Sequence, residues 1–186
     1  MKIALLAALA LPLVALADSP IVDAARSRIG VTTSYDPSYV SLEYPGGDVP
    51  EHCGVCTDVV VRALRKSIKL DLQKALYEDM KANFSAYPKI WGLKRPDRNI
   101  DHRRVPNLQR YFKRKGFSLP VKSGTDQYLP GDLVTCTVPP HLPHIMVVSD
   151  KKTAEGIPLV IHNIGSGTKE EDRLTDFKIT GHYRVK

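Results

Sequence analysis

The chain has 186 residues, of which 42% are hydrophobic and 25% are charged, the balance of a globular protein with one sizeable core. Its three cysteines are an odd number and too few for a disulfide-stapled scaffold, so at least one thiol is free. The formal net charge of +7 favours anionic partners such as cell-wall polymers or lipid headgroups. No nucleic-acid-binding module is recognisable, so we expect no nucleic-acid partner.

An apolar segment opens the chain. The basic residue Lys2 precedes the apolar residues 3–17, which end in the triplet Ala-Leu-Ala, a pattern that suits a signal peptidase. The segment is shorter than the roughly 20 residues that span a bilayer. We therefore predict a signal peptide over residues 1–17 and a single domain over residues 18–186. The predicted location is periplasmic or secreted, without stable membrane insertion.

Helical spacing of apolar residues predicts helices over residues 21–29, 56–66, 72–80 and 107–115. The first helix is expected to be capped by Asp18 or Ser19 and to stop at Gly30. The second contains three consecutive valines, which are reluctant helix formers. Residues 32–54 are rich in Tyr, Pro, Gly and Asp, and residues 87–106 show no periodicity, so both segments are predicted to be irregular.

After Pro130-Gly131 the pattern changes to short runs rich in β-branched residues and separated by turn residues. These runs predict strands over residues 132–138, 144–150, 158–164 and 177–185. Helices followed by antiparallel strands indicate an α+β domain rather than a doubly wound parallel sheet.

Cys56 stands at the start of the second predicted helix, in the sequence Gly-Val-Cys-Thr. Helix-terminal amides and the helix dipole stabilise a thiolate at such a position. The same geometry leaves the Cys56 backbone N–H available to a developing oxyanion. Alternatively, Cys56 is a small buried apolar residue at the start of a core helix.

Two histidines stand on successive predicted strands. His144 opens one apolar strand, and His162 lies on the next. Adjacent antiparallel strands set such side chains next to one another on one face. Because a nucleophilic thiol needs a base, and the base needs an orienting partner, these histidines are the candidates for both roles.

The order of these features resembles the NlpC-type cell-wall peptidases, which have a papain-like fold. In that group a helix-capping Cys, a His that opens one strand and a polar residue, often His, on the next strand form the catalytic set. More closely, the chain resembles a family of exported bacterial proteins of unknown function, domain-of-unknown-function family 1287, which is grouped with those hydrolases. Similar segments span nearly the whole of residues 18–186: GVCTDVV, DLQ, EDM, YP-x-x-WGL-x-x-PD-x-NIDHRRVPNL, LPH, IHNIGSGT and ITGHYR.

The resemblance implies Cys56 as nucleophile, His144 as general base and His162 as the orienting group. It implies an exported cysteine hydrolase, an endopeptidase or amidase that cleaves an amide bond in peptidoglycan stem peptides through a thioester. The same residues would fit a transferase with the same thioester intermediate. They would also fit either a wall-remodelling enzyme or a secreted antibacterial toxin. The nucleophile pattern of NlpC-type enzymes is Asp-Cys-Ser, whereas this chain has Asp58 two residues after the cysteine. A carboxylate beside the thiol opposes thiolate formation.

A charged block, Asp101, His102, Arg103 and Arg104, lies in the second irregular segment. Arginine forks match carboxylates, which abound in stem peptides, so one hypothesis is that the block binds substrate. The alternative is an ion-paired structural loop in which Asp101 holds one of the two arginines. His102 as the third catalytic residue is a further, weaker alternative. Trp91, the single tryptophan, is expected in the core rather than in a cleft.

Cys53 and Cys56 form a CxxC motif, which suggests a thiol–disulfide oxidoreductase or a redox control of Cys56 by Cys53. Such oxidoreductases place the motif directly after a strand of a βαβ unit, and here a turn-rich loop precedes it. A zinc site formed by these cysteines and His52 is a weaker hypothesis still, because the chain has no second pair of ligands at the spacing of a zinc finger. A non-catalytic cell-wall-binding protein of the same fold is the last alternative. We expect a monomer with no cofactor and no metal, whose partner is peptidoglycan or its peptide fragments.

Overall fold

The computed structural model describes residues 19–186 and shows an α+β architecture, as predicted. The predicted signal peptide and Asp18 lie outside the described residues. The helices are α1 (Pro20–Arg26), α2 (Cys56–Ile68), α3 (Leu72–Asn83) and α4 (Val105–Arg114), with short 3₁₀ turns η1 (Phe84–Ala86) and η2 (Asp101–Arg103). In this part of the chain, none of the helices has the length and apolar character needed to cross a membrane.

The helices follow the predicted order with shifted ends. The first ends at Arg26, three residues earlier than predicted, and the residues up to Gly30 form turns. Ser19 precedes it in an extended conformation, and its side chain makes no capping hydrogen bond. The predicted start at Cys56 is confirmed. The fourth helix begins at Val105, two residues early, because Pro106 is pre-organised for a first helical turn.

Six strands form the main sheet in the order β3-β8-β4-β5-β6-β7, and all neighbours in it are antiparallel. Their bounds are β3 (Ser118–Leu119), β4 (Leu133–Val138), β5 (Leu142–Lys152), β6 (Pro158–Asn163), β7 (Thr168–Glu171) and β8 (Lys178–Tyr183). The four predicted strands are confirmed, whereas β3 and β7 were not predicted. The predicted irregular segment 32–54 contains only the short parallel pair β1 (Ser34–Tyr35) and β2 (Cys53–Gly54).

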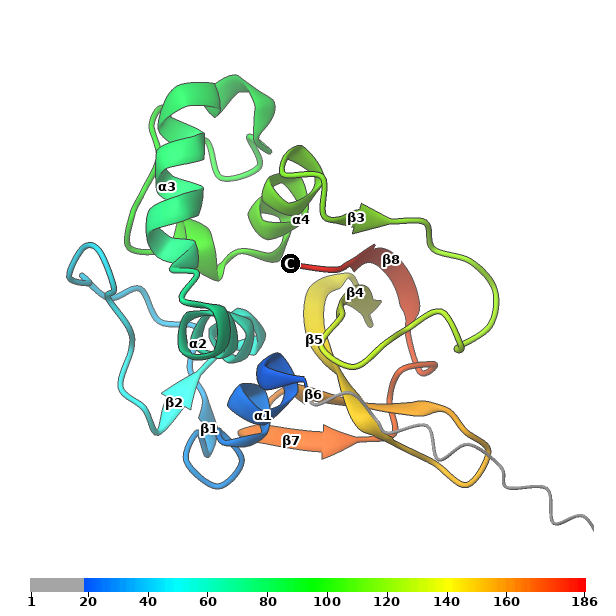
Figure 1. Ribbon diagram of the computed structural model, residues 1–186. Coiled ribbons are helices and arrows are strands. Elements are labelled where there is room, and N and C mark those ends of the chain that lie inside the picture. The colour runs from blue at the N-terminus through cyan, green and yellow to red at the C-terminus, as the bar shows by residue number, and fades with distance from the viewer. Residues whose placement is uncertain (1–18) are drawn as a thin grey trace, which may run out of the picture.

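The sheet separates two apolar clusters. Figure 1 shows α1 and α2 beside the sheet, with α3 farther from it. Alternation along the strands sends Ile145 and Ile161 into the cluster that the helices cover. Their neighbours Met146 and Val160 enter a smaller cluster on the other face. The sheet is therefore buried on both faces.

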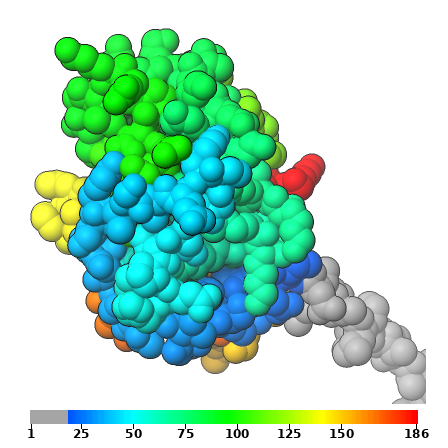
Figure 2. Space-filling model, turned by 90° about the vertical axis from the view of Figure 1, so that its left-hand side faces the viewer, coloured from blue at the N-terminus to red at the C-terminus, as the bar shows by residue number. Residues whose placement is uncertain are grey.

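The two irregular segments, residues 32–54 and 87–106, lie side by side on one face of the molecule (Figure 2). The backbone N–H of Leu42 donates to Asn99 at 3.0 Å, and the hydroxyl of Tyr39 contacts Asp97 at 3.1 Å. Polar contacts thus join segments that are more than 50 residues apart in sequence. Together they build the surface in front of the first turn of α2.

Candidate active site

Cys56 is the first residue of α2, where it lines a pocket of about 300 Å³. The carboxylate of Asp58 accepts the backbone N–H of Val55 at 2.6 Å, which stabilises the start of the helix. The first N–H groups of a helix have no partner inside it. The N–H groups of Cys56 and Thr57 lie next to the Cys56 thiol and disfavour its protonation.

The Cys56 thiol faces the strand that carries His144. The hydrogen-bonded pairing of β5 with β6 begins at Val147 and Ile161, so the earlier part of β5 diverges from β6. In that part, the backbone N–H of Ile145 points to the Cys56 sulfur. Pro143, on the other side of His144 in sequence, lines the same pocket as the cysteine. The structure thus brings the predicted nucleophile to the strand position of the predicted base.

The imidazoles of His144 and His162 are in direct contact, as expected from their strands. His144 Nε2 lies 2.9 Å from His162 Nδ1, and both side chains are buried. The remaining ring nitrogen of His144, Nδ1, is therefore the one available to a thiol. Burial lowers the pKa of His144 to about 3, with a further contribution from His162. Burial also raises the pKa of Cys56 to about 12. At neutral pH both groups are thus uncharged.

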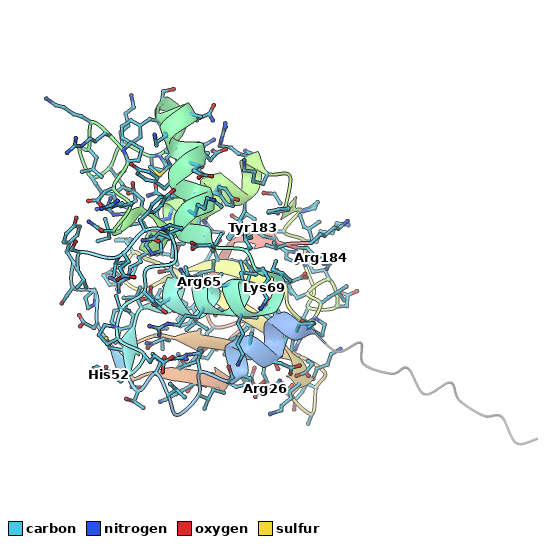
Figure 3. The ribbon with its side chains drawn as sticks, turned by 60° about the vertical axis from the view of Figure 1, so that its left-hand side comes forward. Arg26, His52, Arg65, Lys69, Tyr183 and Arg184 are labelled. Carbon is cyan, nitrogen blue, oxygen red and sulfur yellow. The ribbon has the colours of Figure 1, made fainter. Side chains whose placement is uncertain are left out.

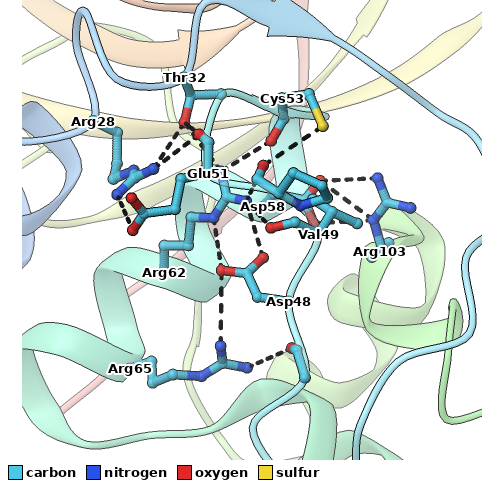
Figure 4. A network of polar contacts seen from close by, with 12 residues as sticks. Arg28, Thr32, Asp48, Val49, Glu51, Cys53, Asp58, Arg62, Arg65 and Arg103 are labelled. Atoms are coloured by element: carbon cyan, nitrogen blue, oxygen red, sulfur yellow. Dashed lines mark hydrogen bonds and ion pairs between the residues drawn. The ribbon is translucent and has the colours of Figure 1, made fainter.

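Asp58 is neutralised by Arg103. Arg103 Nε lies 3.0 Å from Asp58 Oδ1 (Figure 4). Arg103 also donates to the backbone carbonyls of Asp36 and Ser38. The hydroxyl of Thr57 donates to the carbonyl of Arg103 at 3.0 Å. The unfavourable effect of a carboxylate near the thiol is thereby reduced, and η2 is fixed against the start of α2.

The charged block divides between the interior and the pocket. Asp101 and His102 are buried, and Asp101 accepts hydrogen bonds from Arg104 and from the backbone of Asp97. Burial lowers the pKa of His102 to about 4. Arg103 and Arg104 do line the pocket. The guanidinium of Arg103 is occupied by Asp58, whereas Arg104 keeps N–H groups that no described side chain accepts.

Trp91 lines the pocket and is only half-buried, so its expected place in the core is wrong. The guanidinium carbon of Arg104 lies 4.2 Å from the centre of its ring system, a cation–π contact. Within residues 19–186, the only side-chain acceptor of Arg104 is Asp101, at 2.9 Å from Nη1. A cation with N–H groups that no other described side chain accepts thus lines a mostly apolar pocket.

The other cysteines are apart from this arrangement. Cys53 packs with Leu42 and Val49 in a separate small cluster, and its thiol contacts the carbonyl of Pro50 at 3.5 Å. Cys136 is buried opposite His144 on β4, and all three cysteines are free thiols. The predicted redox partner of Cys56 is therefore not bonded to it.

His52 is exposed directly before β2, where Figure 3 labels it. The two cysteines of the CxxC motif are buried. Among the described residues, no cluster of three or more His, Cys, Asp or Glu side chains has an arrangement that could hold a metal ion.

Two residues of this region were not predicted. Tyr35 lines the pocket, and its pKa is raised to about 12, chiefly by burial and also by Cys56 and Asp58 nearby. Its phenol is thus a hydrogen-bond donor beside the cysteine. Glu171 Oε2 lies 3.3 Å from His162 Nε2. Neither residue stands in a sequence pattern that points to a site.

Together, fold and site define an α+β protein with a helix-capping cysteine beside a pair of buried histidines. Residues 22–185 match the family described as domain of unknown function DUF1287, and the chain belongs to that family. It is 56% identical over 164 residues to the Escherichia coli (strain K12) protein named "Uncharacterized protein YijF". The matched region covers 88% of this chain and 80% of that relative. No solved structure matches the chain.

Proposed function

We propose that the protein is an exported cysteine hydrolase with an NlpC-type, papain-like fold, in which Cys56, His144 and His162 are the catalytic residues. The observation that carries the proposal is the 2.9 Å contact of His162 with His144, which lies on the strand that faces the Cys56 thiol. A nucleophile, a base and an orienter in this order suffice for acyl transfer.

The reaction starts from a neutral thiol and a neutral imidazole. Since the pKa of Cys56 is raised and that of His144 is lowered, the proton passes from sulfur to His144 Nδ1 only as the sulfur attacks an amide carbonyl. The N–H groups at the start of α2, and the phenol of Tyr35, which lines the same pocket as Cys56, are the proposed donors to the developing oxyanion. His144 then protonates the leaving amine, and water hydrolyses the thioester.

The pocket suggests the kind of amide. Its wall is mostly apolar, and Arg104 presents free N–H groups over Trp91. These features suit a peptide with an aliphatic side chain and a free carboxylate near the bond that is cleaved. Peptidoglycan stem peptides have this chemistry, and the resemblance to cell-wall peptidases together with the predicted signal peptide supports them as substrates. The proposed location is periplasmic or secreted.

A redox function is less well supported. A CxxC oxidoreductase needs a reactive thiolate with low pKa and a partner thiol close to it. Here burial raises the pKa of Cys56, and Cys53 packs into a different apolar cluster. We therefore propose Cys53 as a packing residue.

The test is digestion of purified peptidoglycan with wild type, Cys56→Ala and Cys53→Ala, with the products identified by mass spectrometry. The wild type and Cys53→Ala are expected to release the same fragments, and Cys56→Ala none. Unchanged peptidoglycan in every sample would remove the substrate assignment. Release of fragments by Cys56→Ala would refute the assignment of Cys56 as the nucleophile. Loss of release in a folded Cys53→Ala would favour the redox alternative.

A further inference from the structure

The histidine pair permits two arrangements of its shared proton. In the first, His144 Nε2–H donates to His162 Nδ1, and His144 Nδ1 is an acceptor. In the second, His162 Nδ1–H donates to His144 Nε2, and His144 Nδ1 carries a proton. The 2.9 Å contact accommodates both. Only the first leaves His144 able to take a proton from Cys56.

Glu171 stands at the far end of this pair. In the register of β6 with β7, His162 pairs with Lys169 and Glu171 pairs with Val160. Glu171 is therefore two residues along from the partner of His162, on the same face of the sheet, a diagonal that a long side chain spans. Its Oε2 lies 3.3 Å from His162 Nε2.

The nitrogen that faces Glu171 is otherwise isolated. His162 is 1% exposed, and within residues 19–186 its Nε2 has no partner with regular hydrogen-bond geometry. A buried polar atom without a partner is costly, so the nearby carboxylate is the group that decides its protonation. Arg173 Nε lies 3.4 Å from the same carboxylate oxygen, which keeps a cation beside Glu171.

We propose that Glu171 selects the active proton arrangement and is thus a positioning residue of the catalytic set. A carboxylate only accepts hydrogen bonds, so it favours a proton on His162 Nε2. A neutral His162 with its proton there must accept at Nδ1, and this forces the proton of His144 onto Nε2. The opposite arrangement would place the lone pair of His162 Nε2 against a carboxylate oxygen.

The same contact acts during the reaction. When His144 takes the proton from Cys56, the histidine pair becomes positively charged in a buried place, which is unfavourable by itself. Burial lowers the pKa of His162, and the charge of Glu171 partly offsets this effect. The catalytic consequence rests on the proposed hydrolase function, whereas the proton arrangement does not.

The variant that tests the proposal is Glu171→Gln. A carboxamide has nearly the same shape but can also donate, so its NH₂ group can stabilise the wrong arrangement. The matched control is Glu170→Gln. Glu170 is the neighbouring carboxylate on the opposite face of β7, where it pairs with Arg26 and Lys151. The control is expected to lower stability without changing the histidines.

Nitrogen-15 NMR of the histidine rings reads the arrangement without any substrate. In wild type and in Glu170→Gln, both His144 and His162 are expected as Nε2–H tautomers at neutral pH. In Glu171→Gln, a second population with Nδ1–H is expected on both rings. A wild type with the proton of His144 on Nδ1, or a Glu171→Gln spectrum identical to wild type, would overturn the proposal.

Activity supplies the second readout. Glu171→Gln is expected to lower kcat/KM at least about tenfold, with the larger effect on kcat, because an interaction with a charged group is lost in the transition state. Glu171→Asp, which keeps an acceptor-only group, is expected to recover part of it. If the tautomers change as expected while no variant, including wild type, is active, the hydrolase function fails and the selection by Glu171 stands. Full activity of Glu171→Gln would overturn the catalytic role.

Discussion

Arg103 Nε lies 3.0 Å from Asp58 Oδ1, and both side chains are almost completely buried beside the helix turn that carries Cys56. The same carboxylate accepts the backbone N–H of Val55, and the same guanidinium binds the carbonyl of Ser38. A single ion pair therefore joins the start of α2, the turn η2 and the loop after β1. Arg103 also lines the pocket of Cys56, so the ion pair helps to fix the wall of that pocket.

Arg103→Met is expected to lower the free energy of unfolding by about 3–5 kcal/mol, because it leaves the Asp58 carboxylate buried without a counter-charge. Urea denaturation followed by circular dichroism measures this. Asp58→Asn combined with Arg103→Met should cost less than the sum of the single changes. The exposed Arg110→Met is the control, expected within about 0.5 kcal/mol of wild type. Additive single and double variants would show that the pair is not coupled.

The resting protonation of Cys56 predicts its reactivity. Since its pKa is raised to about 12, its thiolate fraction at pH 7 is on the order of a thousandfold below that of an ordinary thiol. Alkylation by iodoacetamide, located at Cys56 by peptide mass mapping, should be slow at pH 6 and rise continuously up to pH 9. A thiolate–imidazolium pair would instead give fast alkylation with a plateau at low pH, and that result would refute the neutral resting state.

Local signals were enough to predict the elements that hold Cys56, His144 and His162. Helical spacing and a Gly-Val-Cys start mark the helix, and apolar runs rich in β-branched residues mark the two strands, so the two histidine side chains were expected to meet. Glu171 had no such signal. It lies on a four-residue strand, Thr-Lys-Glu-Glu, without apolar alternation, and its place follows only from pairing with β6.

The contacts of the charged block, residues 101–104, were likewise predictable only in part. An ion pair of Asp101 with a neighbouring arginine was one of two hypotheses, and Arg104 provides it. The partner of Arg103, however, is Asp58, 45 residues earlier, and no local pattern connects them. Trp91 was expected in the core because large apolar side chains favour burial. In an irregular segment no periodicity says which way such a side chain points, and stacking with Arg104 holds it at the pocket.

Burial of His102 predicts loss of stability in mild acid. Its pKa falls from an ordinary value near 6.5 to about 4 in the folded state, mainly by burial and next by Arg103. The unfolded chain therefore binds the extra proton first, and stability present above pH 6.5 is lost as pH falls towards 4. The loss amounts to about 2–3 kcal/mol by pH 4.5.

Urea denaturation at pH 7 and pH 4.5 tests this. The non-titrating variant His102→Gln should show a smaller drop between the two pH values than wild type does, whatever its stability at pH 7. His141→Gln changes an exposed histidine and should keep the wild-type drop. Equal drops in wild type and His102→Gln would mean that His102 is protonated in the folded state as readily as in the unfolded one.

Arg104 predicts a preference for carboxylate substrates. Its guanidinium stacks on Trp91 and lines the pocket of Cys56, and among residues 19–186 its one side-chain acceptor is Asp101. A charge-assisted hydrogen bond is worth about 1.5–3 kcal/mol, so Arg104→Leu should lower kcat/KM for a peptide with a free carboxylate by about 10–100-fold. The matched peptide amide, which lacks the charge, should lose much less.

The ratio of kcat/KM for the acid and the amide, measured by liquid chromatography of the products, isolates the contact from general damage to the pocket. Arg104→Lys, a point charge without the planar fork, should keep part of the preference. Trp91→Phe should also lower the acid-to-amide ratio of kcat/KM, because the smaller ring supports the Arg104 guanidinium less well. If the acid-to-amide ratio is the same in wild type and Arg104→Leu, Arg104 does not bind the substrate carboxylate. Its role is then to stabilise η2 through its ion pair with Asp101.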